Sequence, residues 1–246
     1  MRAQENGFGR APAPADKGHA MKRSAVNDLI REGAAFLSAF NVHLPPFAFW
    51  PPAEMAVRDH AMIAARGLGW DVTDYGQGRF EELGLFLFTL RNGLKEDLAA
   101  GSGMLYAEKL LISRRDQLSP MHRHILKAED IINRGGATLV LELFASAPDG
   151  RICRHSEVSV PCDGQIRTLP PGGRLALAPG ESVTLLPGVW HAFWGEGGDV
   201  LIGEVSTVND DTTDNVFEMD IGRFSQIEED EPPLHLLVSD YGTWLR

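Results

Sequence analysis

Residues 120–136 read PMHRHILKAEDIINRGG. The spacing of the histidines and the glutamate in this stretch predicts a strand whose side chains share one cation. His122 and His124 are two positions apart, so on a β-strand both imidazoles lie on the same face. Glu129 follows five residues after His124. Side chains placed in this way on a strand and the turn after it could bind one cation together.

A fourth candidate ligand, His191, ends the run PGVWH at 187–191, just after a tight turn between two strand-like segments. Neutral imidazoles together with one carboxylate suit manganese, iron, nickel or zinc better than calcium or magnesium. A single strand histidine is more often a hydrogen-bonded or surface group than a ligand, so the prediction depends on the whole set. The predicted metal ligands are His122, His124, Glu129 and His191.

Outward from this stretch, the chain after Gly69 consists of short β-branched or apolar runs that glycine, proline and aspartate interrupt. Turn signals such as Pro148-Asp149-Gly150 separate these runs, and no βαβ alternation is present. This pattern predicts an all-β sandwich or barrel. The expected strands are Leu83–Leu90, Leu105–Ser113, Thr138–Phe144, Ile152–Val160, Arg174–Ala178, Ser182–Leu186 and Val200–Val205.

Two helices are expected before the β region. Apolar residues recur at three and four positions between Ser24 and Phe40, with Ser24 as the N-cap, which predicts an amphipathic helix. The second helix is expected from Ala53 to Arg66, after a proline pair, and should end at Gly67.

The two ends of the chain differ from the β region in composition. Residues 1–20 are rich in Ala, Pro and Gly without apolar periodicity, so we expect a disordered leader followed by a single domain over residues 21–246. The tail, about 209–246, is acidic and turn-like before it becomes apolar again. We expect it to pack back onto the barrel or onto a partner subunit.

Composition narrows the classes of partner. A formal net charge of -11, with 34 acidic against 23 basic residues, argues against nucleic acid or an anionic membrane as partner. Cys153 and Cys162 form no CxxC zinc pattern and no dense disulfide framework, which fits a reducing cytoplasm. No apolar run is long enough for a membrane span, and no secretion signal is evident, so we expect a soluble cytoplasmic protein.

The candidate ligands resemble the two-part signature of the cupin superfamily, which is HxH, Glu and Gly in the first motif and PxG followed by His in the second. The first motif is matched almost completely, including Gly136, whereas the second is looser because Pro187-Gly188 replaces PxG. The resemblance implies a cupin fold, a mainly β jelly-roll barrel, here with N-terminal helices packed on it.

A narrower resemblance is carried by MHRHILKAEDIINRGG, HAFWGE, VLIGEVSTVNDD and RFSQIEEDEPP, four strings between residues 121 and 233. They are similar to those of the D-lyxose isomerase family of bacterial cupins. This resemblance implies a homodimeric cytoplasmic enzyme that interconverts D-lyxose and D-xylulose, often also D-mannose and D-fructose. It also implies a divalent metal, manganese first, with zinc, cobalt, nickel or iron as alternatives, on the four ligands already named.

Four more residues are candidates for the chemistry, since isomerisation needs a base and stabilisation of an enediol. Glu204 lies in the apolar run VLIGEV, where a carboxylate is costly unless it faces a polar cavity or a partner. Lys109 faces the barrel interior by strand parity, although an exposed strand lysine is the commoner case. Asp214 and Arg223 lie in the tail that the resemblance marks as characteristic.

Other interpretations remain open from the sequence. Glu228 or Glu229 could fold over the barrel mouth as the base, and Trp190, Phe193 and Trp194 could support a sugar ring or serve as core. Another metal-dependent cupin enzyme, such as a dioxygenase, and a sugar-binding cupin without catalysis are the alternative functions.

Overall fold

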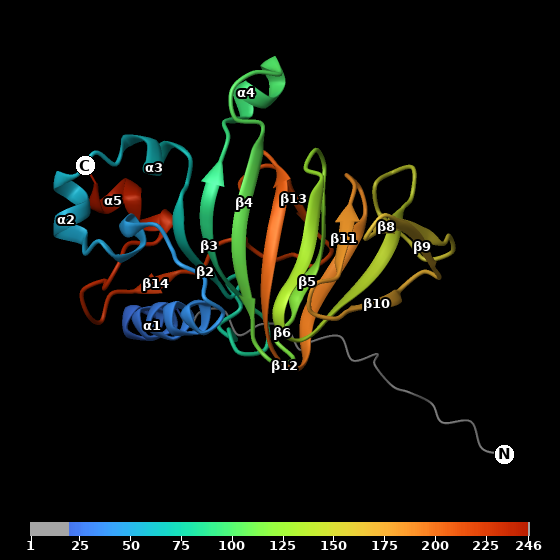
Figure 1. The fold of residues 1–246 in the computed structure, drawn as a ribbon, viewed down its shortest axis with the longest axis horizontal. Coiled ribbons are helices and arrows are strands. Elements are labelled where there is room, and N and C mark those ends of the chain that lie inside the picture. The colour runs from blue at the N-terminus through green and yellow to red at the C-terminus, as the bar shows by residue number, and fades with distance from the viewer. Residues whose placement is uncertain (1–19, 246) are drawn as a thin grey trace.

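A computed structural model describes residues 20–245, whose centre is a curled sheet of ten strands (Figure 1). Strands β6 (Glu129–Ser146) and β12 (Trp190–Thr207) pair antiparallel and form its middle. The sheet order is β10-β6-β12-β4-β3-β2, with β5, β7, β11 and β13 joined to it at the sides. The predicted β-barrel class is therefore confirmed.

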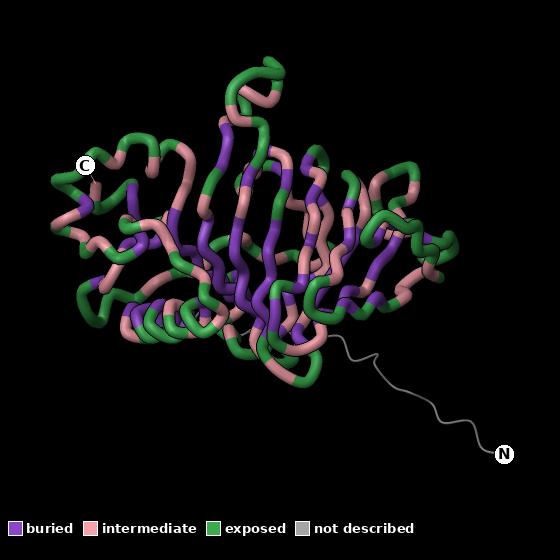
Figure 2. Tube along the Cα trace, in the orientation of Figure 1, coloured by how far each residue is buried: buried purple, intermediate pink, exposed green. Residues whose placement is uncertain are grey.

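Along each strand of this sheet, successive side chains point alternately to an inner and an outer face. The remaining members are β2 (Gly69–Thr73), β3 (Leu85–Asn92), β4 (Tyr106–Ser113), β5 (Ser119–His124), β7 (Ile152–Cys153), β10 (Gly173–Leu177), β11 (Ser182–Leu185) and β13 (Asn215–Phe217). A separate hairpin consists of β8 (Val158–Cys162) and β9 (Gln165–Leu169). Inward-facing Leu111, Leu141 and Val183 form part of the barrel core, and buried residues fill the central strands (Figure 2).

Several predicted strand bounds were wrong. The run Ile152–Val160 divides into β7 and β8, with a polar loop between them. Strands β6 and β12 extend far beyond Thr138–Phe144 and Val200–Val205, because polar residues and glycines such as Gly135-Gly136 and Gly197-Gly198 interrupt the apolar pattern without ending the strand. Strands β2, β9 and β13 were not predicted. Both cysteines are free thiols.

Helix α1 (Arg23–Ala39) covers the outer face of the sheet beside β2 and β3 (Figure 1). Its apolar side packs on Trp70 and Phe86, and Gly33 allows the close approach because a Cβ there would lie 2.0 Å from the Phe86 ring. The predicted N-cap was wrong by two residues. Ser24 lies inside the helix, where its hydroxyl donates to Asp230 at 2.7 Å.

The second predicted helix is broken in two. Helix α2 (Pro52–Val57) ends at Arg58, whose backbone is extended at φ -86° and ψ 162°, and α3 (Ala61–Ala65) follows. The His60 ring bonds the carbonyls of Met55 and Arg58, which stabilises the break. Short helices α4 (Lys95–Ala100) and α5 (Tyr241–Trp244) and 3-10 turns η1 (Pro46–Phe49) and η2 (Val238–Asp240) complete the helical elements. Among the described residues, no helix has the length and apolar character needed to cross a membrane.

The tail packs back onto the molecule, which was one of the two expectations. Strand β13 pairs with β5, and β14 (Ile227–Glu228) pairs parallel with β1 (Met21–Lys22). Glu229 binds Arg23 at 2.6 Å. The expectation that Glu228 or Glu229 folds over the barrel mouth was therefore wrong. The predicted leader, except for Ala20, lies outside the described residues.

Candidate metal centre and charged cavity

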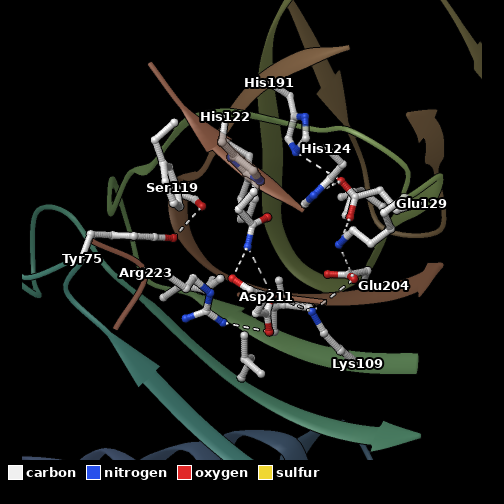
Figure 3. Close-up of a pocket in the computed structure, with 18 residues that line it drawn as sticks. Tyr75, Lys109, Ser119, His122, His124, Glu129, His191, Glu204, Asp211 and Arg223 are labelled. Atoms are coloured by element: carbon white, nitrogen blue, oxygen red, sulfur yellow. Dashed lines mark hydrogen bonds and ion pairs between the residues drawn. The ribbon is translucent and has the colours of Figure 1, made fainter. Parts of the chain in front are cut away.

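Three histidines meet inside the barrel at one end of the sheet (Figure 3). His122 and His124 come from β5, and His191 from β12 lies directly opposite His122 in the antiparallel register. One ligand nitrogen from each of the three lies within 4.8 Å of the others. The strand period of two places both β5 imidazoles on the cavity side, as the sequence predicted.

Glu129, the first residue of β6, completes this group. Its Oε1 lies 3.3 Å from His124 Nε2 and 3.2 Å from His191 Nε2. Within residues 20–245 none of these three atoms has a hydrogen-bond partner, although all three are buried. Buried donors and acceptors are normally satisfied, so converging orphan atoms of this kind fit a shared cation.

Backbone carbonyls orient two of the rings. His122 Nδ1 donates to Pro120 O at 2.8 Å, and His191 Nδ1 donates to Val189 O at 3.1 Å. Because Nδ1 carries the proton, Nε2 of each ring keeps its lone pair for a cation. Burial lowers the pKa of His122 well below its usual value and also lowers the pKa of His124, so both rings stay neutral.

A chain of buried charges lines the cavity beside the histidines (Figure 3). Lys127 Nζ lies 2.7 Å from Glu129 Oε2 and 2.9 Å from Glu204 Oε1. Lys109 Nζ lies 3.5 Å from the same Glu204 oxygen and 3.7 Å from Asp211 Oδ1. Burial alone would lower the pKa of Lys127, but the surrounding carboxylates, first Glu129 and then Glu204, raise it above its usual value. Lys127 is therefore a permanent cation in this cavity.

Arg223 is the last residue in this row of buried charges, on the side away from the histidines. Its Nη2 lies 2.8 Å from Asp71 and 3.3 Å from Asp211, whereas its buried Nη1 finds no hydrogen-bond partner among residues 20–245. Burial would raise the pKa of Asp211, but Arg223, Lys109 and Lys127 hold it well below its usual range. Asp211 is therefore a fixed anion, and Arg223 Nη1 is a donor available to a ligand.

Comparison with known sequences shows which protein family this chain belongs to. A sequence model of the D-lyxose isomerase family matches residues 21–241. The chain is 49% identical over 227 residues to the D-lyxose/D-mannose isomerase of Serratia proteamaculans, covering 90% of this chain and 98% of that protein. It is 45% identical over 226 residues to the D-lyxose/D-mannose isomerase of Escherichia coli O157:H7, with the same coverage of both proteins.

The chain belongs to the D-lyxose isomerase family. The resemblance found in the sequence is thereby confirmed.

Solved structures agree with this family at the level of the fold. The L-ribose isomerase of Acinetobacter sp. DL28 in complex with L-ribose superposes with a TM-score of 0.58 at 16% identity, over 87% of this chain and 100% of that one. The L-ribose isomerase of Cellulomonas parahominis gives a TM-score of 0.57 at 15% identity, over 85% of this chain and 99% of that one. This chain thus shares the barrel fold of these two L-ribose isomerases.

Of the four residues that the sequence predicted to take part in catalysis, three line the cavity, namely Glu204, Lys109 and Arg223. Asp214 lies outside it and accepts hydrogen bonds from the backbone N–H groups of residues 125–127. Of the three aromatic candidates, Phe193 lines the cavity. Trp190 and Trp194 instead lie beneath the guanidinium groups of Arg123 and Arg174.

Sequence reasoning missed Lys127, Asp211 and Tyr75. Lys127 precedes Glu129 by two positions in the same stretch but lies in the turn between β5 and β6, so strand parity does not predict that it faces the cavity. Asp211 ends the string VLIGEVSTVNDD, whose match to the family was noted without regard to its last residue. No sequence signal marks Tyr75, whose hydroxyl lies 3.0 Å from Ser119 Oγ and whose pKa burial raises to about 12.

Proposed function

We propose that this chain interconverts D-lyxose and D-xylulose, and also D-mannose and D-fructose, by moving a proton between neighbouring carbons through an enediol. The observation that carries the proposal is the set of orphan ligand atoms beside a chain of buried charges, in a member of the D-lyxose isomerase family. We further propose that the enzyme works as a homodimer in the cytoplasm.

The metal proposed for this site is a divalent cation, manganese first, held by His122, His124, Glu129 and His191. When bound, such a cation polarises a sugar carbonyl and orients neighbouring oxygens. The donor set supports the proposal because it joins neutral imidazole nitrogens to one carboxylate oxygen. Burial raises the pKa of Glu129, but the Lys127 ammonium outweighs it and holds that pKa well below its usual range, so the carboxylate is ionised and ready to bind.

Glu204 is the proposed base that carries the proton. Four carboxylates, Glu129, Glu204, Asp211 and Asp71, lie in or against the cavity. Glu129 belongs to the ligand set, Asp211 is a fixed anion, and Asp71 is bound to Arg223 at the far end. Glu204 remains, at 5% exposure and with one oxygen oriented by two lysines.

The cations of the cavity have a separate proposed role. Lys127 and Lys109 stabilise the negative charge that develops on a sugar oxygen as the proton leaves carbon, since a preoriented ammonium in a buried site needs no reorganisation. Arg223 Nη1 donates a hydrogen bond to a sugar hydroxyl remote from the reacting carbons. Apolar walls from Leu85, Leu87 and Phe193 exclude water from the reacting carbons.

The test is a sugar assay combined with metal analysis. Protein stripped of metal and reloaded with Mn²⁺ is incubated with D-lyxose in air and under argon, and the products are separated by chromatography. We expect metal-dependent formation of D-xylulose at the same rate in both atmospheres. Oxygen-dependent loss of the sugar would identify a dioxygenase, and tight sugar binding without any product would identify a binding protein; either result overturns the proposal.

A further inference from the structure

The turn between two of the candidate ligands is held from outside the cavity by one carboxylate. His124 ends β5 and Glu129 begins β6, so residues 125–128 connect them and carry Lys127 into the cavity. Asp214 Oδ1 accepts from the N–H groups of Ile125 at 3.0 Å and Leu126 at 2.7 Å. Its Oδ2 accepts from the N–H of Lys127 at 2.9 Å.

These three successive N–H groups form a concave site for an anion, which the Asp214 carboxylate occupies. The Lys127 side chain enters the cavity, whereas its N–H bonds Asp214 outside the cavity. The N–H of Lys127 is buried and those of Ile125 and Leu126 are partly buried, and an amide removed from water without an acceptor is destabilising, so the turn needs an acceptor at this place. Asp214 is itself fixed, because it is 7% exposed and directly precedes β13, which pairs with β5.

The same carboxylate faces the one histidine that lacks a backbone partner. Nδ1 of His122 and Nδ1 of His191 donate to carbonyls two residues before them. His124 Nδ1 has no hydrogen-bond partner within residues 20–245, and Asp214 Oδ2 lies 3.8 Å from it. A nearby carboxylate favours the proton on Nδ1 and so leaves Nε2 free to bind a cation.

We propose that Asp214 is a positioning residue, which fixes the 125–127 turn and the His124 ring and thereby holds His124, Lys127 and Glu129 in the arrangement that binds the metal. The inference rests on the proposed function for its link to catalysis. It assigns Asp214 no contact with sugar, because the side chain lies outside the cavity and lines a separate groove beside α4. This replaces the direct catalytic role that the sequence predicted for Asp214.

The test uses Asp214→Asn, which preserves shape but turns one acceptor oxygen into a donor. The matched control is Asp163→Asn, since Asp163 also accepts a backbone N–H, from Ser182 at 3.1 Å, but lies in the turn between β8 and β9. Two quantities are measured besides activity. They are amide hydrogen exchange of the segment 124–129 in the metal-free protein, and the dissociation constant for Mn²⁺.

For Asp214→Asn we expect exchange in this segment to accelerate roughly tenfold or more. Mn²⁺ binding should weaken by about 10–100-fold, the usual effect of replacing a residue that orients a metal ligand. Turnover should return towards the wild-type value at saturating Mn²⁺, and Asp163→Asn should match wild type throughout. Wild-type exchange and Mn²⁺ affinity would overturn the inference. Normal Mn²⁺ affinity with lost turnover would also overturn it, in favour of a direct catalytic role.

Should Asp214→Asn fail to fold, Asp214→Glu gives the same two readouts. It keeps the charge but displaces it by one methylene, so we expect Mn²⁺ affinity and amide protection below the wild-type values. Wild-type values for both in Asp214→Glu would contradict the inference. If the wild-type protein isomerises no sugar, the proposed function fails while exchange and Mn²⁺ binding still decide the role of Asp214.

Discussion

Single side chains on neighbouring strands determine which groups line the cavity. His122, His124 and Glu204 face the cavity because alternate strand residues point to the same side. Parity could not predict Asp214, whose function depends on a turn rather than on a strand. Nor could it predict the pairing of Arg223 with Asp71, because the two residues are 152 positions apart and only the folded tail brings them together.

The base is tested by Glu204→Gln, which preserves shape and leaves the metal ligands unchanged. We expect turnover to fall by roughly 100-fold or more, the usual scale for loss of a general base, while metal content stays stoichiometric. Steady-state kinetics and metal analysis provide the measurements. Glu228→Gln is the control and should remain near wild type, since Glu228 lies on β14 away from the cavity. Near wild-type turnover in Glu204→Gln would exclude Glu204 as the base.

The ligand set is tested by His191→Ala. Removing one of four ligands should release the metal and abolish activity, while the barrel persists with a lower melting temperature. The exposed His155 gives the control, because His155→Ala leaves the cavity intact. Elemental analysis measures the metal content, and circular dichroism measures the folded barrel and its melting temperature. Stoichiometric metal and full activity in His191→Ala would show that the site assignment is wrong.

At the scale of elements, the sequence predicted which segments are strands better than where they end. Apolar periodicity located the core of β6 and β12, but their full lengths include Glu129 and His191, which lie outside the predicted strands Thr138–Phe144 and Val200–Val205. The break between α2 and α3 depends on His60 bonding two backbone carbonyls, which no periodicity encodes. Tertiary contacts therefore decide these bounds.

The junction of α1 with the tail depends on one buried cation. Arg23 is fully buried and binds Glu229 at 2.6 Å and Asp240 at 2.8 Å. Arg23→Met should lower the free energy of unfolding by about 3–5 kcal/mol, because it leaves Asp240 buried without its cation. Urea unfolding measures this change.

Arg31→Met is the matched control on the same helix. Arg31 pairs with Asp28 at an exposed site, so its replacement should cost less than about 1 kcal/mol. Equal losses for the two variants would show that the Arg23 cluster adds no specific stability.

At the scale of the whole molecule, the barrel places distant segments around one small polar cavity. Strands β4, β5, β6 and β12, together with the turn between β5 and β6, supply the lysines, histidines, Glu129 and Glu204, and the tail supplies Asp211 and Arg223. The four carboxylates in or against the cavity outnumber its three buried cations by one, so a divalent cation is electrostatically favoured there. The arrangement of the fold and its charges thus supports this end of the barrel as the proposed place of reaction.

We propose that this cavity holds a metal and a sugar next to Glu204. A crystal structure of the protein with Mn²⁺ and D-xylulose tests it most directly. We expect an anomalous difference peak within about 2.0–2.3 Å of ligand atoms of His122, His124, Glu129 and His191. We also expect a Glu204 carboxylate oxygen within about 3 Å of the carbon that exchanges its proton. A metal bound elsewhere, or a ketose whose reacting carbons lie out of reach of Glu204, would contradict the account.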